Sequence, residues 1–190
     1  MKVGVLALQG AFREHREALE SLGVSVAEVR TPEGLAGVDA IVMPGGESTT
    51  MHHLLASSGL VDPLQEAIGG GLAVFGTCAG LILLARDVLD GRADQTPLGA
   101  IDLTARRNAY GRQRDSFEAD LRIAGLEGPD FRGVFIRAPA IERVGDAVVV
   151  LAEHNGRPVL AKEGRVWVSS FHPELAGDRR VHERFLEEVA

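Results

Sequence analysis

Short apolar runs alternate with amphipathic stretches along the first half of the chain. Runs rich in Val, Leu and Ile predict buried strands at residues 3–8, 24–29, 40–43 and 72–77. Amphipathic patterns predict helices at residues 11–22, 48–58, 61–68 and 79–87. Ser48 is in position to cap the second of these helices. Because strands and helices alternate, we expect a largely parallel, doubly wound sheet with helices on both faces.

The second half of the chain has a different pattern. Short strands, several of them joined by glycine turns, are predicted at residues 100–103, 116–121, 134–136, 148–153, 159–161 and 166–171. A last helix is predicted from near Asp178 through Phe185. No charged, Pro-rich or Ser-rich linker divides the sequence. We therefore expect residues 1–190 to form a single α/β domain of three layers, with an antiparallel extension beside the parallel core.

The chain is acidic, with 20 basic and 27 acidic residues and a formal net charge of −7. This balance argues against a general nucleic-acid-binding protein. A local basic cluster is present, and before motifs are considered its simplest interpretation is a solvated loop. Its members are Arg106, Arg107, Arg112 and Arg114.

The N-terminal apolar stretch is too short for a signal peptide or a membrane span, and Gln9 and Gly10 interrupt it. The single cysteine cannot form an internal disulfide. Both features favour a cytoplasmic protein.

Candidate chemistry begins with the segment Gly76-Thr77-Cys78-Ala79-Gly80, between a predicted strand and a predicted helix. It is the cysteine counterpart of the G-x-S-x-G nucleophile elbow, in which glycines permit a sharp turn and close packing. The N-terminus of the following helix favours the reactive thiolate form of Cys78. A buried core cysteine is the alternative, because free cysteines are often buried.

A second candidate segment, His172-Pro173-Glu174, follows the last predicted strand. A cysteine nucleophile needs a base beside the sulfur and a group that orients the base. His172 and Glu174 can supply both, because Pro173 is expected to hold the backbone extended with the two side chains on the same side. The other histidines fit less well, and we assign them surface or packing roles. They are His15, His52, His53, His154 and His182.

The turn Pro44-Gly45-Gly46-Glu47-Ser48 lies between a predicted strand and a predicted helix. Free backbone N–H groups at such a turn can stabilise an oxyanion, although an ordinary capped turn has the same pattern. No metal site is predicted, because there is one cysteine and the side chains of His52 and His53 are expected to point apart on a helix.

These motifs, in this order, resemble those of class I glutamine amidotransferases, and more narrowly those of the glutaminase subunits of pyridoxal 5'-phosphate synthases. The Cys and His-Pro-Glu motifs mark the superfamily, and the resemblance covers nearly the whole chain. It implies a class I glutamine amidotransferase-like, flavodoxin-like fold. The segments that carry it are LQGAFREH (8–15), PGGESTTM (44–51), FGTCAGLILLA (75–85), RNAYGRQRDSFEADL (107–121), GVFIRAP (133–139), EHNGRPV (153–159) and SFHPEL (170–175).

The resemblance also implies residue roles. Cys78, His172 and Glu174 would form the catalytic triad, and the N–H groups of Gly46 and Ala79 would stabilise the oxyanion. Arginine can grip the α-carboxylate of glutamine with two parallel hydrogen bonds. Neither a metal nor an organic cofactor is expected. The residues implied in substrate binding are Gly46, Glu47, Ser48, Arg107, Ile136 and Arg137.

The implied reaction is hydrolysis of L-glutamine to L-glutamate and ammonia. The implied partner is a synthase subunit that combines the ammonia with a pentose phosphate and a triose phosphate to make pyridoxal 5'-phosphate. Several alternatives stay open. They are the glutaminase subunit of another ammonia-using synthase, such as imidazole glycerol phosphate synthase, another cysteine hydrolase, such as a peptidase or deglycase, and a non-catalytic binding subunit.

The turn at Gln9 and Gly10 suggests how a partner could control the reaction. It ends the first strand, so a parallel sheet places it at the same edge as Gly46 and Cys78. A docked partner could press on Gln9 and fix the Gly46 peptide in its donating orientation. We therefore predict that the isolated chain is a poor glutaminase and that the synthase activates it.

Overall fold

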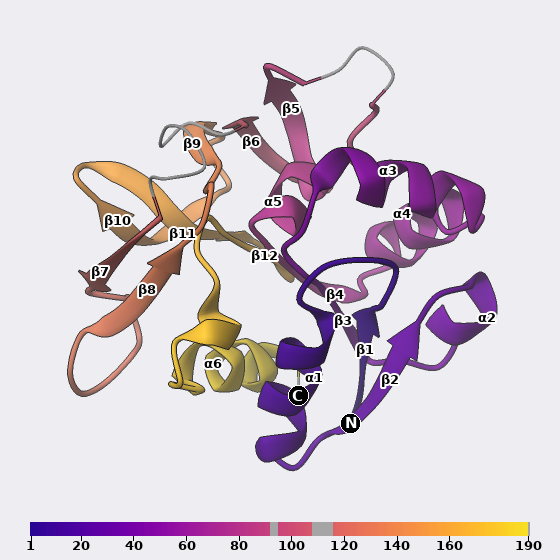
Figure 1. The fold of residues 1–190 in the computed structure, drawn as a ribbon, viewed down its shortest axis with the longest axis horizontal. Helices are drawn as coiled ribbons and strands as arrows, with labels where there is room; N and C mark the ends of the chain where they lie inside the picture. Colours follow the sequence, from indigo (N-terminus) through magenta and orange to yellow (C-terminus); the bar gives the residue numbers. More distant parts are fainter. Residues whose placement is uncertain (92–94, 108–115, 190) are drawn as a thin grey trace.

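A seven-stranded sheet forms the centre of the computed structural model, which describes residues 1–91, 95–107 and 116–189 (Figure 1). Its strand order is β10-β11-β12-β4-β3-β1-β2. Five neighbouring strands are parallel: β12 (Val166–Ser169), β4 (Ala73–Thr77), β3 (Ala40–Met43), β1 (Lys2–Leu6) and β2 (Ser25–Val29). At one edge, β11 (Arg157–Glu163) and β10 (Val149–His154) extend the sheet by antiparallel pairing.

Two smaller sheets and the helices surround this centre. One small sheet contains β5 (Ala85–Leu89), β6 (Ile101–Arg106) and β9 (Ala140–Val144), and the other contains β7 (Phe117–Leu121) and β8 (Phe131–Phe135). The helices are α1 (Phe12–Ser21), α2 (Pro32–Leu35), α3 (Ser48–Ser57), α4 (Val61–Gly69), α5 (Ala79–Leu84) and α6 (Arg180–Val189), with a 3-10 turn η1 (Pro173–Leu175). Within the described residues, no helix combines the length and apolar character that a membrane crossing requires.

Two hydrophobic cores lie on opposite faces of the central sheet. Successive residues of a strand point to opposite faces, so β4 places Val74 in one core and Phe75 in the other. The Val74 core is covered by α3, α4 and α5, and the Phe75 core by α1 and α6 (Figure 1). The predicted three-layer α/β architecture with an antiparallel extension is therefore confirmed.

The predicted elements differ from the structure in a few places. The helix predicted over 79–87 ends at Leu84, because the backbone becomes extended at Ala85 and residues 85–89 pair with β6. Helix α2 and strand β9 were not expected from the pattern. For residues 85–89 and for β9, pairing with β6 overrides a weak local signal.

The parallel topology brings the motif segments together. Strands β1, β3, β4 and β12 are parallel neighbours, so their carboxyl ends meet at one edge of the sheet. The segments that follow these ends carry Gln9, Gly46, Cys78 and His172. In open α/β sheets this edge is where ligands usually bind.

Candidate active site

Cys78 lies in a sharp turn between β4 and α5. Its backbone has φ 49° and ψ −99°, a left-handed conformation that residues other than glycine adopt rarely. The turn is held from both sides, because the Cys78 N–H donates to Ser169 O at 2.8 Å and the Ile82 N–H donates to Cys78 O at 3.3 Å. The predicted nucleophile elbow is therefore present, and Cys78 lines a pocket instead of packing in the core.

The glycines around Cys78 are required by close packing. A Cβ atom on Gly76 would lie 2.7 Å from the backbone carbonyl carbon of Gly80, and one on Gly80 would lie 2.2 Å from Met43 O. No side chain fits at such distances without a shift of the backbone. The elbow is thus packed directly against the end of β3, as the sequence predicts.

His172 and Glu174 meet beside the elbow. His172 Nδ1 lies 2.7 Å from Glu174 Oε1, and both side chains are buried. The backbone between them is not extended as predicted, because Pro173 begins the 3-10 turn η1. The His172 N–H donates to Val134 O at 2.8 Å, which ties this segment to β8.

The charges of this pair follow from its surroundings. Burial disfavours the charged form of His172, but hydrogen bonds to Cys78 and Glu174 outweigh burial and raise the pKa of His172 to about 10. Burial also raises the pKa of Glu174, yet facing His15 and His172 holds it well below its usual range. At neutral pH the geometry therefore favours an imidazolium held by a carboxylate.

The turn before α3 packs against the turn after β1. The Ala11 N–H donates to Gly45 O at 3.0 Å, and the Glu47 N–H donates to Gln9 Oε1 at 2.9 Å. A Cβ atom on Gly45 would lie 2.3 Å from His172 Cε1, so Gly45 touches the predicted base. Gln9 does not line the pocket itself. Its side chain contacts the turn before α3 through the Glu47 N–H.

Glu47 rather than Ser48 caps α3. The Glu47 carboxylate accepts hydrogen bonds from Thr49 N at 3.1 Å and Thr50 N at 2.7 Å, which corrects the predicted Ser48 cap. Burial alone would raise the pKa of Glu47, but these bonds lower it to about 2. Ser48 is the first helical residue, and its buried hydroxyl has no hydrogen-bond partner among the described residues.

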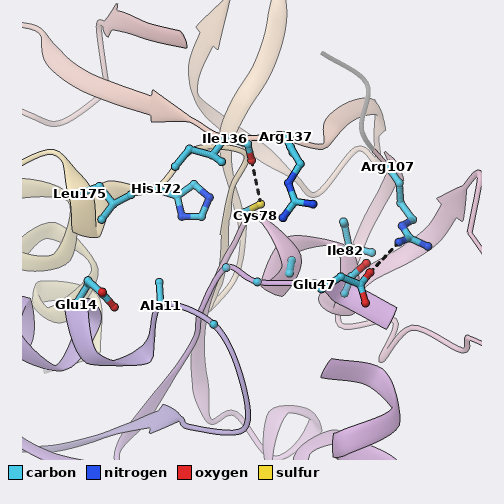
Figure 2. A pocket seen from close by; sticks show the side chains of 15 residues that line it. Ala11, Glu14, Glu47, Cys78, Ile82, Arg107, Ile136, Arg137, His172 and Leu175 are labelled. Atoms are coloured by element: carbon cyan, nitrogen blue, oxygen red, sulfur yellow. Dashed lines mark hydrogen bonds and ion pairs between the residues drawn. The ribbon is translucent and has the colours of Figure 1, made fainter. Parts of the chain in front are cut away.

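A pocket of about 320 Å³ collects the predicted residues. In Figure 2 the Cys78 sulfur faces the carbonyl of Ile136 at 3.9 Å, with His172 and Arg137 on either side. Arg137 forms no ion pair with another described residue, so its guanidinium is available to an anion. The pocket is lined by Gly10, Ala11, Glu14, Gly45, Gly46, Glu47, Ser48, Cys78, Ala79, Ile82, Arg107, Ile136, Arg137, His172 and Leu175.

Arg107 lies at the other end of this pocket from His172 (Figure 2). Its guanidinium donates to Glu47 Oε1 at 3.2 Å and to Thr49 Oγ1 at 3.2 Å, so the solvated-loop interpretation does not hold for it. Arg106 instead pairs with Asp90 and Glu142 outside the pocket. Arg112 and Arg114 lie outside the described residues.

Several residues near the chemistry were not predicted. Glu14, Ile82 and Leu175 line the pocket. His15, which was assigned a surface or packing role, is fully buried, and its Nε2 lies 3.2 Å from Glu174 Oε2. A signal for His15 exists in the helical spacing, because it shares the buried face of α1 with residues three and four positions later.

Comparison with known proteins places this geometry in a family. The SNO glutamine amidotransferase family model matches residues 5–190. Pyridoxal 5'-phosphate synthase subunit PdxT of Mycobacteroides abscessus is 56% identical over 187 residues, which span 98% of this chain and 96% of that protein. The PdxT subunit of Frankia alni is 53% identical over 188 residues, which span 99% of this chain and 94% of that protein. A crystal structure of a glutamine amidotransferase, 50% identical, covers 98% of both chains with a TM-score of 0.93. The chain therefore belongs to the SNO glutamine amidotransferase family.

Proposed function

We propose that this chain hydrolyses L-glutamine to L-glutamate and ammonia as the glutaminase subunit of a pyridoxal 5'-phosphate synthase. The observation that carries the proposal is Cys78 on a strained elbow, in one pocket with His172 and backed by Glu174. Family membership and relatives named as subunits of that synthase support it. Residues 1–190 act as one domain, and a cytoplasmic location suits the free thiol of Cys78.

The reaction begins from the pair in which His172 already holds the proton of Cys78 as an imidazolium, and the Cys78 thiolate attacks the side-chain carboxamide of glutamine. The tetrahedral oxyanion accepts hydrogen bonds from the N–H groups of Gly46 and Ala79. His172 protonates the departing nitrogen, ammonia leaves, and a γ-glutamyl thioester remains on Cys78. Water, deprotonated by His172, then releases glutamate and restores the thiol. Glu174 orients His172 and stabilises its imidazolium.

The rest of the pocket recognises the amino-acid end of glutamine. Arg137 binds the α-carboxylate, because its guanidinium is unpaired among the described residues. Glu47 is ionised and accepts the α-ammonium, while Arg107 holds Glu47 in place at 3.2 Å. The unpartnered hydroxyl of Ser48 supplies a further hydrogen bond, and Ile136 packs against the substrate's methylenes. Ammonia then passes to the synthase subunit that binds over this edge of the sheet.

Glutamate release by the chain mixed with its candidate synthase tests this proposal. Wild type should release glutamate and support glutamine-dependent formation of pyridoxal 5'-phosphate, and Cys78→Ala should do neither. Because Ala retains the Cβ atom, the thermal unfolding temperature should change little. A glutamine-like electrophile should label Cys78 in wild type. Normal turnover by Cys78→Ala would overturn the mechanism, and glutaminase activity only with another synthase would overturn the choice of partner.

A further inference from the structure

Two histidines lie behind Glu174, on the side away from His172. His15 on α1 and His182 on α6 are both fully buried. His15 Nδ1 lies 3.0 Å from His182 Nε2, and His15 Nε2 lies 3.2 Å from Glu174 Oε2. These contacts extend the row of side chains that begins at Cys78 into the core between the two helices.

Glu174 depends on this contact for its second oxygen. The carboxylate is buried, and Oε1 is occupied by His172. His15 Nε2 lies between Glu174 Oε2 at 3.2 Å and Thr77 Oγ1 at 3.1 Å. Its N–H is therefore shared between two oxygens rather than aimed straight at Oε2, which explains why Oε2 has no hydrogen bond of regular geometry among the described residues. Among the described residues, His15 is the one donor that faces this buried anionic oxygen.

The contacts favour one tautomer of each histidine. Burial lowers the pKa of His182 to about 3, so His182 is neutral at working pH. If His182 donates from Nε2, the nitrogen Nδ1 of His15 accepts and the single N–H of His15 sits on Nε2, facing Glu174. The nitrogen left without a partner is then His182 Nδ1 as a lone pair, which is a smaller loss than a buried N–H without an acceptor. The opposite tautomer would aim a nitrogen lone pair at a carboxylate.

We propose that His15 is a positioning residue for glutamine hydrolysis: its Nε2–H holds Glu174 as an oriented anion, and Glu174 in turn holds His172. The inference rests on the proposed function. The N–H groups in the row then converge on Glu174, from His182 through His15 on one side and from His172 on the other. The depressed pKa of Glu174 agrees with a carboxylate stabilised by both histidines. Thr77 and Arg179 also face this cluster, Thr77 at His15 Nε2 and Arg179 at the backbone oxygen of Glu174.

A matched pair of variants separates positioning from packing. His15→Gln retains a side-chain N–H near the position of Nε2, whereas His15→Met has similar length and no donor. With the synthase partner present, His15→Met should lose roughly tenfold to a hundredfold in kcat, the loss expected when a hydrogen bond to a charged group disappears. His15→Gln should recover most of that loss. KM for glutamine should change little in either variant, because His15 does not line the pocket.

Two further measurements test whether His15 acts on His172 through Glu174. In His15→Met the pKa of Glu174 should rise, so the acid limb of the kcat/KM profile should move toward neutral pH, and His15→Gln should move it less. In a Glu174→Gln background, His15→Met should cause almost no further loss of kcat.

The outcomes are distinguishable. Failure of wild type to hydrolyse glutamine would overturn the proposed function. An active wild type with His15→Met of equal kcat and unchanged acid limb would overturn the role of His15. Equal loss in His15→Gln and His15→Met, together with lowered unfolding temperatures, would assign His15 to packing and also overturn it.

Discussion

At the scale of single residues, two residues that line the pocket, Cys78 and Arg137, have a backbone φ in the left-handed region. A residue other than glycine in the left-handed region costs about 1–3 kcal/mol and persists only where its surroundings enforce it. Cys78 adopts φ 49°, and hydrogen bonds from its own N–H and from Ile82 N hold the turn. The strain directs the sulfur out of the core and into the pocket, where a substrate can reach it.

The ion pair of His172 and Glu174 predicts how stability depends on pH. The pKa of His172 is raised from 6.5 to about 10 in the folded protein, so the folded state binds more protons than the unfolded state between these values. The pair's contribution is therefore fully present between pH 4.5, above which Glu174 is ionised in both states, and pH 6.5, and it is lost as the pH rises toward 10. In Glu174→Gln this decline should be shallower, because the amide carries no charge. Urea unfolding at a series of pH values measures the slope, and equal slopes in both proteins would contradict the assigned charges.

Residue-scale prediction from sequence succeeds where the motif is local. Cys78, His172 and Glu174 lie in two short segments, and the structure brings all three together. His15 could not be found in this way, because its partners Thr77 and His182 are 62 and 167 positions away in the chain. A histidine on an amphipathic helix has the same pattern whether it packs, faces solvent or supports a catalytic carboxylate.

At the scale of elements, two turns that pack against each other set the orientation of the Gly46 N–H. The turn before α3 contacts the turn after β1 through Ala11 N to Gly45 O and Glu47 N to Gln9 Oε1. The predicted oxyanion donor Gly46 lies between these two bonds. Since the C=O and N–H of a trans peptide point in opposite directions, anchoring Gly45 O also fixes the direction of the Gly46 N–H.

Gly45→Ala should disturb the site through contact rather than through backbone strain. The new methyl would lie 2.3 Å from His172 Cε1 and 3.3 Å from Cys78 Cβ, so the imidazole must move. A displacement on the order of 1 Å costs about a hundredfold in rate, and we expect a loss of kcat/KM of that size. Glutamate release with the synthase present measures it.

Gly69→Ala is the matched control for that substitution. Gly69 ends α4, and a Cβ atom there meets nothing within 4 Å. Its activity should be unchanged, and its stability should stay equal or rise by up to about 1 kcal/mol, because Ala favours helix over Gly. Full activity in Gly45→Ala would show that His172 does not sit against this turn during catalysis.

The elements themselves were predictable to different degrees. Strands β1, β3 and β4 are buried on both faces, whereas β2 is a partly exposed edge strand; all four read as apolar runs, so the pattern locates them within two residues. The sequence predicts helix after Leu84, whereas the structure has strand β5, because alternating and helical patterns are hard to distinguish over a few residues and pairing with β6 decides between them. The cap of α3 was misassigned, since Glu47 and Ser48 can both accept from the first turn.

At the scale of the whole molecule, the parallel sheet gathers the proposed reaction site at one edge. The segments after β1, β3, β4 and β12 all reach this edge, from four separated regions of the sequence. Leu175 lines the pocket and leaves 43% of its surface exposed, an apolar group at the pocket rim. The family resemblance read from the motifs is confirmed, whereas the gating role of Gln9 stays a prediction.

Gating by the synthase is the last prediction, and Gln9 is its proposed lever. The Gln9 side chain accepts the Glu47 N–H at 2.9 Å, and a Cβ atom on Gly46 would clash with its Oε1, so we expect movement of Gln9 to disturb the turn that carries Gly46. We expect wild type to release glutamate slowly alone and faster with the synthase, and Gln9→Ala to lose most of that activation.

Gln9→Glu, which retains the accepting oxygen, is the control and should preserve more of the activation than Gln9→Ala does. Steady-state glutamate release with and without the synthase gives the ratio for each protein. The affinity of each variant for the synthase, measured separately, shows whether a variant fails to be activated by the bound synthase or fails to bind it. Full activity of wild type alone would rule out gating and leave the triad intact. Activation that persists undiminished in Gln9→Ala would contradict only the role of Gln9. The hydrogen bond from the Ala11 N–H to Gly45 O would then be the remaining contact that links the partner to the peptide between Gly45 and Gly46.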